Sequence, residues 1–321
     1  MSDLNTPVLL MIFNRPETTN RIFEAVRKTR PKQLFVAADG PRPGRADDEE
    51  NCRLTRDIVT QIDWDCELQT LFRSENLGCG LGPAQNITWF FEHVEKGIIL
   101  EDDCLPDPSF FSFCGEMLDF HERNLSVGQI SGDNFQHGRK RGETSYYFSK
   151  YFHICGWATW RNRWEAYSFN IKNADAIINQ KIIDLKCETV QERRFWYRKL
   201  DMLRGGQRKD IWDYQWMFAN WYLNRISAVS NVNLISNIGF DTDATHTVQF
   251  NPKVANLPTE PINIIVHSDH IVENTLADHY TFFKSGTFSQ PSFQDRIRWK
   301  AKKLIRSILK VLKKTRPVKH T

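Results

Sequence analysis

Three consecutive acidic residues, Glu101, Asp102 and Asp103, follow the apolar segment GIIL. Neighbouring carboxylates at the end of a buried strand repel one another, which costs stability unless a cation neutralises them. Such oxygen ligands suit Mg²⁺ or Mn²⁺, and Mg²⁺ usually keeps several waters and bridges substrate phosphates. The alternative is a helix N-cap with solvated acids, which Pro106 and Pro108 disfavour because they oppose an immediate helix. The acidic run therefore predicts a divalent-cation site that binds a diphosphate.

A carboxylate among aromatic residues, Asp213 in the segment WDYQW, is the candidate general base. Aromatic neighbours exclude water and raise the pKa of a carboxyl group, which suits a group that takes a proton from an attacking hydroxyl. The alternative is that Asp213 caps the helix that follows it. The residues alone leave both interpretations open.

A glycine-rich segment, RSENLGCGLG, spans residues 73–82. It is not a dinucleotide-binding fingerprint, because Pro83 stands where the third glycine of G-x-G-x-x-G belongs. It also follows the third apolar segment of the chain, whereas that fingerprint follows the first. We interpret it as a flexible loop that opens a helix beside a ligand pocket, with a plain turn as the alternative.

The elements around these residues must bring them together. Strands are expected at 8–13, 34–39, 68–72 and 97–103, and amphipathic helices at 17–30, 45–62 and 84–95. This alternation predicts right-handed crossovers and an open, mostly parallel α/β sheet with helices on both faces. Ligands bind such sheets at the carboxyl ends of the strands. The polar residues at those ends are Asn14, Arg15, Asp39, Arg73, Asn76 and the acidic run.

The pattern becomes mixed after residue 119. Further strands are expected in VGQISGDNF, SYYFSKYF and AVSNVNLIS, with a polar helical insertion at about residues 173–210 and an aromatic-rich helix at 213–224. No internal repeat or low-complexity linker divides this part of the chain. We therefore predict one domain at 1–291, followed by a basic amphipathic helix at 292–321.

Five short motifs, in order along the chain, resemble glycosyltransferases of the GT-A fold: FNRPETT, ADG, R-x-E-N-x-G, EDD and CGWATW. The likeness covers about residues 6–250 and is strongest to the β-1,2-N-acetylglucosaminyltransferase type and its bacterial relatives. It implies a GT-A α/β fold and an inverting transfer of a hexosyl or N-acetylhexosaminyl group from a nucleotide-diphosphate sugar to a hydroxyl. It also implies Mn²⁺ or Mg²⁺ as the cofactor.

The resemblance further implies roles for individual residues. Arg15 would meet the donor diphosphate, Asp39 the nucleobase and Asp103 the metal. Arginine offers a planar fork to phosphate oxygens, and a carboxylate can accept the imide N–H of uracil, which favours a UDP-sugar. The W-D segment of the family places its base at Asp213. The remaining donor-binding candidates are Asn14, Arg73, Asn76, Glu101 and Asp102.

Two more residues are candidates. Trp157, in CGWATW, would be a stacking platform on a loop over the donor sugar or the acceptor, whereas core packing is the alternative for Trp160 and Trp164. His246, which follows the Gly239 turn, is a candidate metal or phosphate ligand, although a lone histidine is more often structural.

The C-terminal residues differ from the rest of the chain in charge. Eleven of the 43 bases and none of the 39 acids lie in residues 296–321, so the remainder is net negative. Apolar residues from Ile297 to Leu312 fall on one helical face, after a capping-box pattern at Ser292 and Asp295. This predicts a helix on an anionic membrane surface. Nucleic-acid binding and a disordered solubilising tail are the alternatives.

Composition limits the class of protein. With 321 residues, 40% of them hydrophobic, the chain is long enough for one large α/β domain and is not collagen-like or all-membrane. Its first apolar run is broken at Asn14, which predicts a strand and not a signal peptide. The seven cysteines show no zinc-ligand spacing. We expect a cytoplasmic protein, peripheral on the inner membrane.

Two other functions compete with glycosyl transfer. A sugar-1-phosphate nucleotidyltransferase would share the open sheet, but the glycine-rich, lysine-bearing loop expected after its first strand is replaced here by FNRPETT. The non-enzymatic alternative is a membrane-associated protein that binds sugar nucleotides without turnover.

Overall fold

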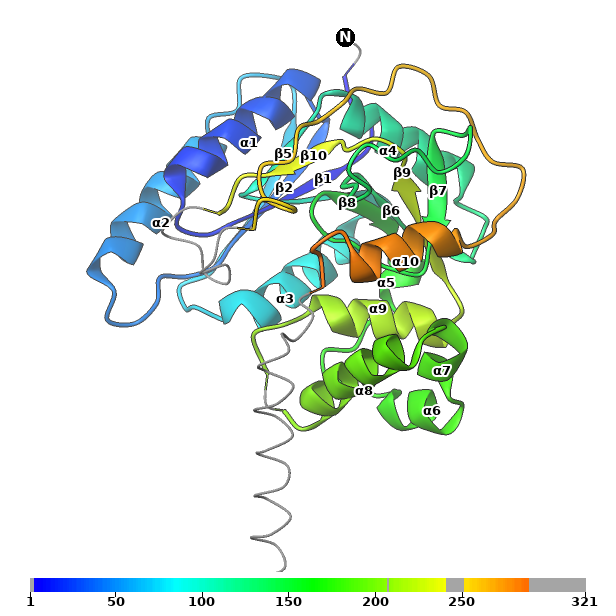
Figure 1. Cartoon of the computed structure of the whole chain (residues 1–321). Helices are drawn as coiled ribbons and strands as arrows, with labels where there is room; N and C mark the ends of the chain where they lie inside the picture. Colours follow the sequence, from blue (N-terminus) through cyan, green and yellow to red (C-terminus); the bar gives the residue numbers. More distant parts are fainter. Residues whose placement is uncertain (1–2, 207, 241–250, 289–321) are drawn as a thin grey trace, which may run out of the picture.

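The computed structural model describes residues 3–206, 208–240 and 251–288. Its centre is an eight-stranded sheet with the strand order β3-β2-β1-β4-β8-β6-β9-β7 (Figure 1). A second, two-stranded sheet joins β5 to β10. The mixed α/β class expected from the sequence is confirmed.

The first four strands form the parallel half of the sheet, with β1 pairing to β2 and β4, and β2 pairing to β3. Apolar, mostly buried strands alternate with helices in this half, as the hydrophobic pattern predicts. The elements are β1 Val8–Ile12, α1 Pro16–Thr29, β2 Gln33–Ala38, α2 Ala46–Val59, β3 Glu67–Phe72, α3 Gly78–His93 and β4 Lys96–Glu101.

Helices cover both faces of this half, as predicted. Strand β1 sends Leu10 into the core that contains Ile22 of α1, and Leu9 into the core that contains Ile87 of α3. Because neighbouring side chains of a strand point to opposite faces, α1 and α3 lie on opposite sides of the sheet.

The second half of the sheet is mixed. Strand β8 Trp157–Trp160 runs antiparallel to β4 and to β6 Val127–Ser131, so β6 runs in the direction of β4. Strand β9 Ile226–Ser230 is parallel to β6, and β7 Tyr146–Ser149 is antiparallel to β9. The carboxyl ends of β1, β2, β4, β6 and β9 therefore meet at one edge.

A short antiparallel ladder lies directly after the acidic run. Strand β5 Cys104–Pro106 pairs with β10 Ile235–Asn237, which places Asn237 opposite Cys104. The amide of Ile238 also donates to the carbonyl oxygen of Asp103 at 2.8 Å. This ladder brings a segment from late in the chain against the acidic run.

Helix α3 begins earlier than predicted, at Gly78 and not at Ala84. The second half of the glycine-rich segment is therefore helical, and the flexible-loop interpretation was wrong for residues 78–82. The physical reason is tertiary: the Asp39 carboxylate accepts the amides of Leu77 and Gly78, which satisfies the helix N-terminus. A side chain at Gly80 would clash with the backbone of Lys209.

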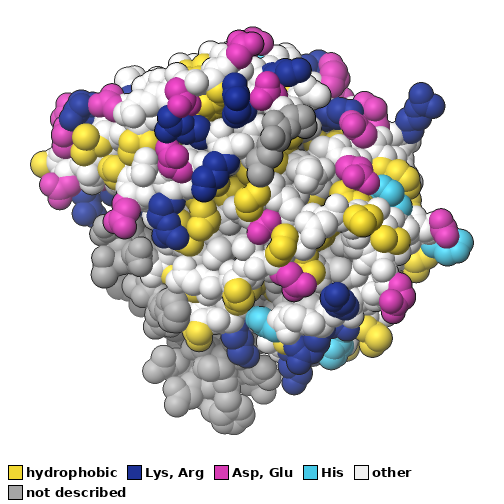
Figure 2. All heavy atoms as spheres, turned by 90° about the horizontal axis from the view of Figure 1, so that it is seen from above, with side chains coloured by type: hydrophobic (Ala, Val, Ile, Leu, Met, Phe, Trp, Pro, Cys, Tyr) yellow, Lys and Arg dark blue, Asp and Glu magenta, His cyan; other side chains and the backbone are white. Residues whose placement is uncertain are grey.

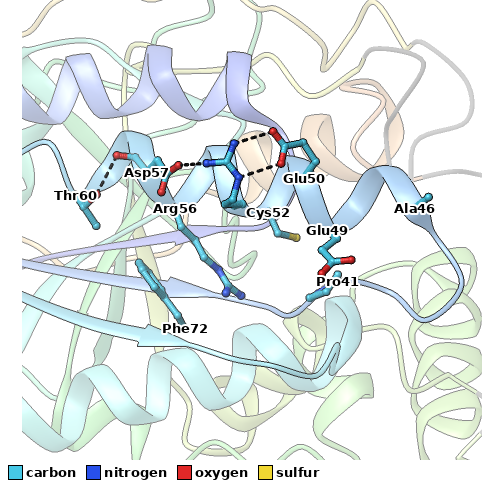
Figure 3. Close-up of a pocket in the computed structure, with 10 residues that line it drawn as sticks. Pro41, Ala46, Glu49, Glu50, Cys52, Arg56, Asp57, Thr60 and Phe72 are labelled. Atoms are coloured by element: carbon cyan, nitrogen blue, oxygen red, sulfur yellow. Dashed lines mark hydrogen bonds and ion pairs between the residues drawn. The ribbon is translucent and has the colours of Figure 1, made fainter.

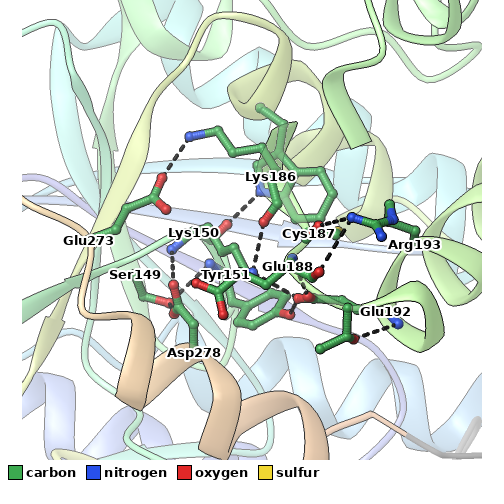
Figure 4. A network of polar contacts seen from close by, with 12 residues as sticks. Ser149, Lys150, Tyr151, Lys186, Cys187, Glu188, Glu192, Arg193, Glu273 and Asp278 are labelled. Atoms are coloured by element: carbon green, nitrogen blue, oxygen red, sulfur yellow. Dashed lines mark hydrogen bonds and ion pairs between the residues drawn. The ribbon is translucent and has the colours of Figure 1, made fainter. Parts of the chain in front are cut away.

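The predicted insertion at about 173–210 consists of three helices in the structure (Figure 1), α6 Ala174–Asn179, α7 Ile182–Lys186 and α8 Val190–Arg204. It is tied to the sheet by a buried ion pair, with Lys150 Nζ 2.8 Å from Glu192, whose carboxylate also accepts the Tyr151 hydroxyl (Figure 4). The other helices in the described part of the chain are α4 Ser109–Phe120, α5 Arg161–Trp164, α9 Asp213–Tyr222 and α10 Thr275–Phe283.

Two predictions concern residues that the structure does not describe. The basic C-terminal helix at 292–321 and His246 both lie outside the described residues. Within the part of the chain that the structure describes, no helix is long and apolar enough to span a bilayer. The division into a domain at 1–291 and a tail stays a prediction.

Candidate active site

A pocket of about 380 Å³ opens at the carboxyl ends of β1, β2 and β4, where the sequence places its polar residues. Most of the predicted donor-binding residues line it, and so do several residues that the sequence did not single out. The predicted ones are Arg15, Asp39, Asn76, Glu101, Asp102 and Asp103. The additional polar or glycine residues include Arg42, Asn86, Asn237 and Gly239.

The acidic run lies against the end of β1. Arg15 Nη1 donates to Asp103 Oδ2 at 3.2 Å and lies 3.8 Å from Asp102 Oδ1. The amide of Phe13 donates to Asp102 Oδ2 at 3.0 Å. The Asp103 side chain is 21% exposed and the Asp102 side chain 11% exposed, so Asp103 is the more accessible of these two carboxylates.

Burial raises the pKa of Glu101 to about 8 and that of Asp102 to about 7, and the charge of Asp103 is the next largest cause in both. Arg15 opposes the shift in each case. The structure therefore contains the like-charge conflict that the sequence predicts. A cation bound at this place would relieve it.

The carboxylates of the acidic run can provide part of the ligand set of Mg²⁺ or Mn²⁺. Within the described ranges, no three His, Cys, Asp or Glu side chains converge to hold a metal. A site made by protein ligands alone is therefore absent from these residues. Mg²⁺, however, is commonly bound through one or two carboxylates and completed by water and substrate phosphates, and Asp103, with Asp102 beside it, can supply that part.

Asp39, at the end of β2, has a structural role that the sequence did not predict. Its carboxylate accepts the amides of Leu77 and Gly78, each at 2.9 Å, and that of Gly40 at 3.1 Å. A negative charge here also complements the dipole at the start of α3. Asp39 lines the pocket, so it can both cap the helix and face a ligand.

Arg42 was missed by the sequence analysis. Its Nε and Nη2 atoms donate to the Asp48 carboxylate of α2 at 2.5 and 2.7 Å. These hydrogen bonds lower the pKa of Asp48 to about 2. Asn14 donates to the same Asp48 at 2.7 Å, and it is not among the residues that line the pocket. The available signal was a basic residue in the turn GPRPG, directly after the second strand.

Two other predicted residues position loops. Asn76 Nδ2 donates to the Gly40 carbonyl at 2.7 Å, which joins the loops after β2 and β3. Arg73 donates to Asn86 of α3 at 3.2 Å, and only Asn86 lines the pocket. Arg73 therefore supports the site from behind.

A separate hollow lies on the outer side of α2, at the β3 edge of the sheet (Figure 3). The Arg56 guanidinium lies over the Phe72 ring, 5.2 Å from its centroid, and donates to the carbonyls of Asp39 and Arg73. None of the predicted site residues lines this hollow. It contributes to the site only through Arg56, which holds the ends of β2 and β3 together.

Asp213 is the first residue of α9, and Trp212 occupies the N-cap position. Asp213 is therefore not the N-cap residue, although an acid in the first turn complements the helix dipole. The charge of Asp213 contributes to the raised pKa of Glu101, so the two carboxylates are within electrostatic reach. Asp213 is partly exposed and does not itself line the pocket.

The stacking role predicted for Trp157 is wrong. Residues 157–160 form the central strand β8 and not a loop, and Trp157 is fully buried. Its indole packs against Trp164, Trp212 and Trp216, with ring centroids 5.9–6.3 Å apart. The side chain belongs to the hydrophobic core, where no sugar can reach it.

Gly239 is a further residue that the sequence analysis did not assign to the site. A side chain at this position would clash with the Asp103 carboxylate. Its amide donates to the Asn237 side-chain oxygen at 3.0 Å. The close approach of a glycine to Asp103 leaves that carboxylate room to face the pocket.

Comparisons with known proteins add little to this description. No family model matches the chain, and no curated protein matches it. Among solved structures it is similar to HddC from Yersinia pseudotuberculosis, at 10% identity and a TM-score of 0.29, over 49% of this chain and 77% of that one. A UDP-glucose pyrophosphorylase complexed with UDP-glucose gives 10% identity and a TM-score of 0.31, over 50% and 78%.

An inositol-1-phosphate CTP transferase from T. maritima gives 12% identity and a TM-score of 0.23, over 47% of this chain and 56% of that one. Likenesses this low, over about half of the chain, carry no argument about chemistry. The functional argument therefore depends on the residues of the site.

Proposed function

We propose that this protein is a glycosyltransferase that transfers a sugar from a nucleotide-diphosphate donor to a hydroxyl of a glycan or lipid-linked acceptor. One observation carries the proposal: Arg15 and Asp103 lie 3.2 Å apart at the ends of β1 and β4, inside a pocket at the carboxyl edge of the sheet. An arginine beside a carboxylate that can hold a cation is an arrangement that can bind a diphosphate. The motif resemblance to GT-A glycosyltransferases supports the same reaction.

Each residue of the pocket has a role in this proposal. Arg15 turns its guanidinium from Asp103 to the diphosphate, and Asp39 faces the nucleobase, where its carboxylate favours the imide N–H of uracil. Asp103, with Asp102 beside it, would hold Mn²⁺ or Mg²⁺, whose charge stabilises the leaving diphosphate. Glu101 stands next to both and lines the nucleotide and sugar.

Asp213 is proposed as the general base. Its carboxylate lies at the start of α9, close enough to Glu101 to affect its pKa. Its partial exposure lets an acceptor hydroxyl approach it. The charge of Asp213 contributes to the raised pKa of Tyr167 and of Tyr214, so both phenols are within its electrostatic reach. Removal of the hydroxyl proton by Asp213 allows attack on the anomeric carbon from the face opposite the diphosphate, which inverts that centre.

Incubation of the full chain with UDP-, GDP- and CMP-sugars, with and without Mn²⁺, tests the proposal. We expect slow metal-dependent hydrolysis of one donor, UDP-linked, in the absence of an acceptor. A parallel reaction with sugar 1-phosphates and nucleoside triphosphates measures pyrophosphate release, which only a nucleotidyltransferase produces. Pyrophosphate release without donor hydrolysis would overturn the proposal, and so would donor binding without any turnover.

A further inference from the structure

A cluster of basic side chains surrounds Tyr280 of α10. It is built from three segments: the loop after β6, the segment that begins at residue 251, and the end of α10. We refer to it as the Tyr280 basic cluster, and its members are His137, Arg139, Lys140, Arg141, Lys253 and Lys284. All of them except Arg141 are exposed.

Among the described residues, neutral contacts and not carboxylates hold the cluster together. The Arg139 guanidinium lies 4.4 Å from the Tyr280 ring centroid and donates to the Tyr280 hydroxyl at 3.0 Å. Arg141 donates twice to the Gln136 side-chain oxygen, at 2.8 and 2.5 Å. Gln136 is buried and donates to Thr281 of α10 at 2.8 Å. The loop is thus anchored to α10.

His137 fixes the turn of this loop. It has a positive φ of 51°, and the next residue, Gly138, has a φ of 76°. One ring nitrogen contacts the Tyr280 hydroxyl at 2.9 Å and the other donates to the Lys253 carbonyl at 2.8 Å. Because a carbonyl only accepts, Nε2 carries the proton. These two ring contacts stabilise the otherwise unfavourable backbone conformation of His137. The contact with the Lys253 carbonyl also holds Lys253 beside the loop.

The charges of this cluster are not neutralised within the described part of the chain. Lys96, Arg161 and Arg204 each pair with an acid. By contrast, no ion pair is formed there by Arg139, Lys140, Arg141, Lys253 or Lys284. Five cations in one place raise the local potential and attract anions. Figure 2 shows Lys, Arg and His side chains gathered at the lower margin of the face it displays, with few acids among them.

The cluster lies next to the candidate active site. The amide of Asn256 donates at 2.8 Å to the carbonyl of Asn237, which lines the pocket. Lys253 is three residues earlier, so its Cα is within roughly 11 Å of that contact. The loop with His137 begins at the carboxyl end of β6, which lies at the same edge of the sheet as the pocket.

We propose that the Tyr280 basic cluster binds a negatively charged group, a phosphate or carboxylate, on the acceptor; this inference rests on the proposed function. Arginine and lysine side chains bind both groups through charge-assisted hydrogen bonds. The cluster lies outside the pocket lined by Arg15 and Asp103, so it is free while the donor is bound. The acceptor is therefore an anionic glycan or a phosphate-linked lipid.

The test measures binding of soluble probes to the full chain by calorimetry in metal-free buffer. The probes are hyaluronan tetrasaccharide for carboxylate, inorganic pyrophosphate for phosphate, and neutral chitotetraose. Pyrophosphate can also meet Arg15 in the donor pocket, so only the part of its binding that the cluster variant removes reports on the cluster. We expect at least one anionic probe to bind about tenfold more tightly than chitotetraose, and this preference to fall with added salt.

The variant Lys140→Glu/Lys253→Glu removes the preference, because it reverses two charges whose side chains support little else. The matched control is Lys32→Glu/Lys172→Glu, which makes the same change in net charge at exposed positions elsewhere. We expect about tenfold weaker anion binding in the first variant and wild-type binding in the control. Equal binding of neutral and anionic probes, or equal losses in both variants, contradicts the proposal.

Two further binding experiments test whether the cluster binds a membrane or a nucleic acid instead. Vesicles with 30 mol% phosphatidylglycerol that bind the wild type but not the Lys140→Glu/Lys253→Glu variant, while soluble probes bind both equally, would assign the cluster to a membrane. Stronger binding of a single-stranded oligonucleotide than of either anionic probe would assign it to nucleic acid. Binding of a UDP-sugar with Mn²⁺ is measured separately, so failure of the donor site is distinguished from failure of the cluster.

Discussion

The Arg15 guanidinium and the Asp103 carboxylate lie 3.2 Å apart, beyond the ends of the paired strands β1 and β4. Each is therefore the partner of the other until a ligand separates them. In the proposed function a metal–diphosphate complex would supply a new partner for both, because the carboxylate would hold the cation and the guanidinium would bind the phosphates. Such an exchange of partners would let donor and metal bind together without leaving a buried charge unpaired.

Asp103→Ala is expected to abolish metal-dependent donor binding while leaving thermal stability unchanged or slightly raised. The charge of Asp103 raises the pKa of Glu101 and Asp102, so its removal relieves repulsion in the free protein. Calorimetry with a UDP-sugar and Mn²⁺ measures the first effect and thermal unfolding the second. Asp65→Ala, at an exposed acid far from the pocket, is the control. Wild-type donor affinity in Asp103→Ala would refute the metal assignment.

Gly239→Ala tests the same carboxylate from the opposite side. The added methyl group meets Asp103 Oδ2, so the carboxylate must shift and the metal-dependent part of donor affinity should fall at least about tenfold. Overpacking of this kind costs about 1–3 kcal/mol of stability. Gly115→Ala, where the new methyl group meets only Thr6 Oγ1, is the control. Unchanged affinity would show that Asp103 does not contact the metal.

Asp213→Asn is expected to keep donor affinity and lose transfer. A general base acts on the acceptor only in the transition state, so kcat should fall by roughly 10²- to 10⁴-fold with little change in donor binding. Single-turnover transfer to a supplied acceptor measures it, with Asp201→Asn on the exposed face of α8 as the control. Transfer within a few-fold of wild type would place the base at another residue.

The parallel half of the fold was predictable because its buried strands and amphipathic helices have distinct hydrophobic periods. The acidic run was also predictable, since three adjacent acids after a buried strand are costly. By contrast, the start of α3 depends on Asp39, about forty residues earlier in the chain, and Gly239 meets Asp103 only because β10 pairs with β5. Trp157 was misassigned because W-A-T-W fits a loop as well as a buried strand. Contacts distant in sequence leave no local pattern.

Deletion of residues 292–321 is expected to release the protein from anionic vesicles without changing donor binding. This prediction depends only on the sequence, in which eleven bases stand in the last 26 residues beside an apolar stripe from Ile297 to Leu312. Salt should weaken the electrostatic attraction between the tail and the vesicle, because the Debye length is about 10 Å at 0.1 M. Burial of the apolar stripe in the membrane should be unaffected by salt. Co-sedimentation with anionic and neutral vesicles measures the effect, and equal pelleting of both proteins would contradict it.

Asp278 should make stability depend on pH. This buried carboxyl group accepts the Ser149 hydroxyl at 2.5 Å and the Lys150 amide at 3.3 Å (Figure 4). Burial raises its pKa to about 7, although Ser149 and Lys150 oppose the shift. In the unfolded chain an aspartate has a pKa of about 3.9. Between these two values the folded state binds the proton that the unfolded state has released, so this group makes stability fall as pH rises from about 4 to about 7.

Asp278→Asn removes the titration and keeps a side chain of the same shape. The free energy of unfolding of the variant, relative to wild type, should therefore rise with pH from about 4 to about 7, by on the order of 2–4 kcal/mol, and then stay level. The pH-independent loss of the Lys150 amide contact shifts the whole difference without changing its slope. Urea unfolding at pH 4.5, 6 and 8 measures it. A difference that is constant, or that falls with pH, would show that Asp278 is ionised in the folded protein throughout this range.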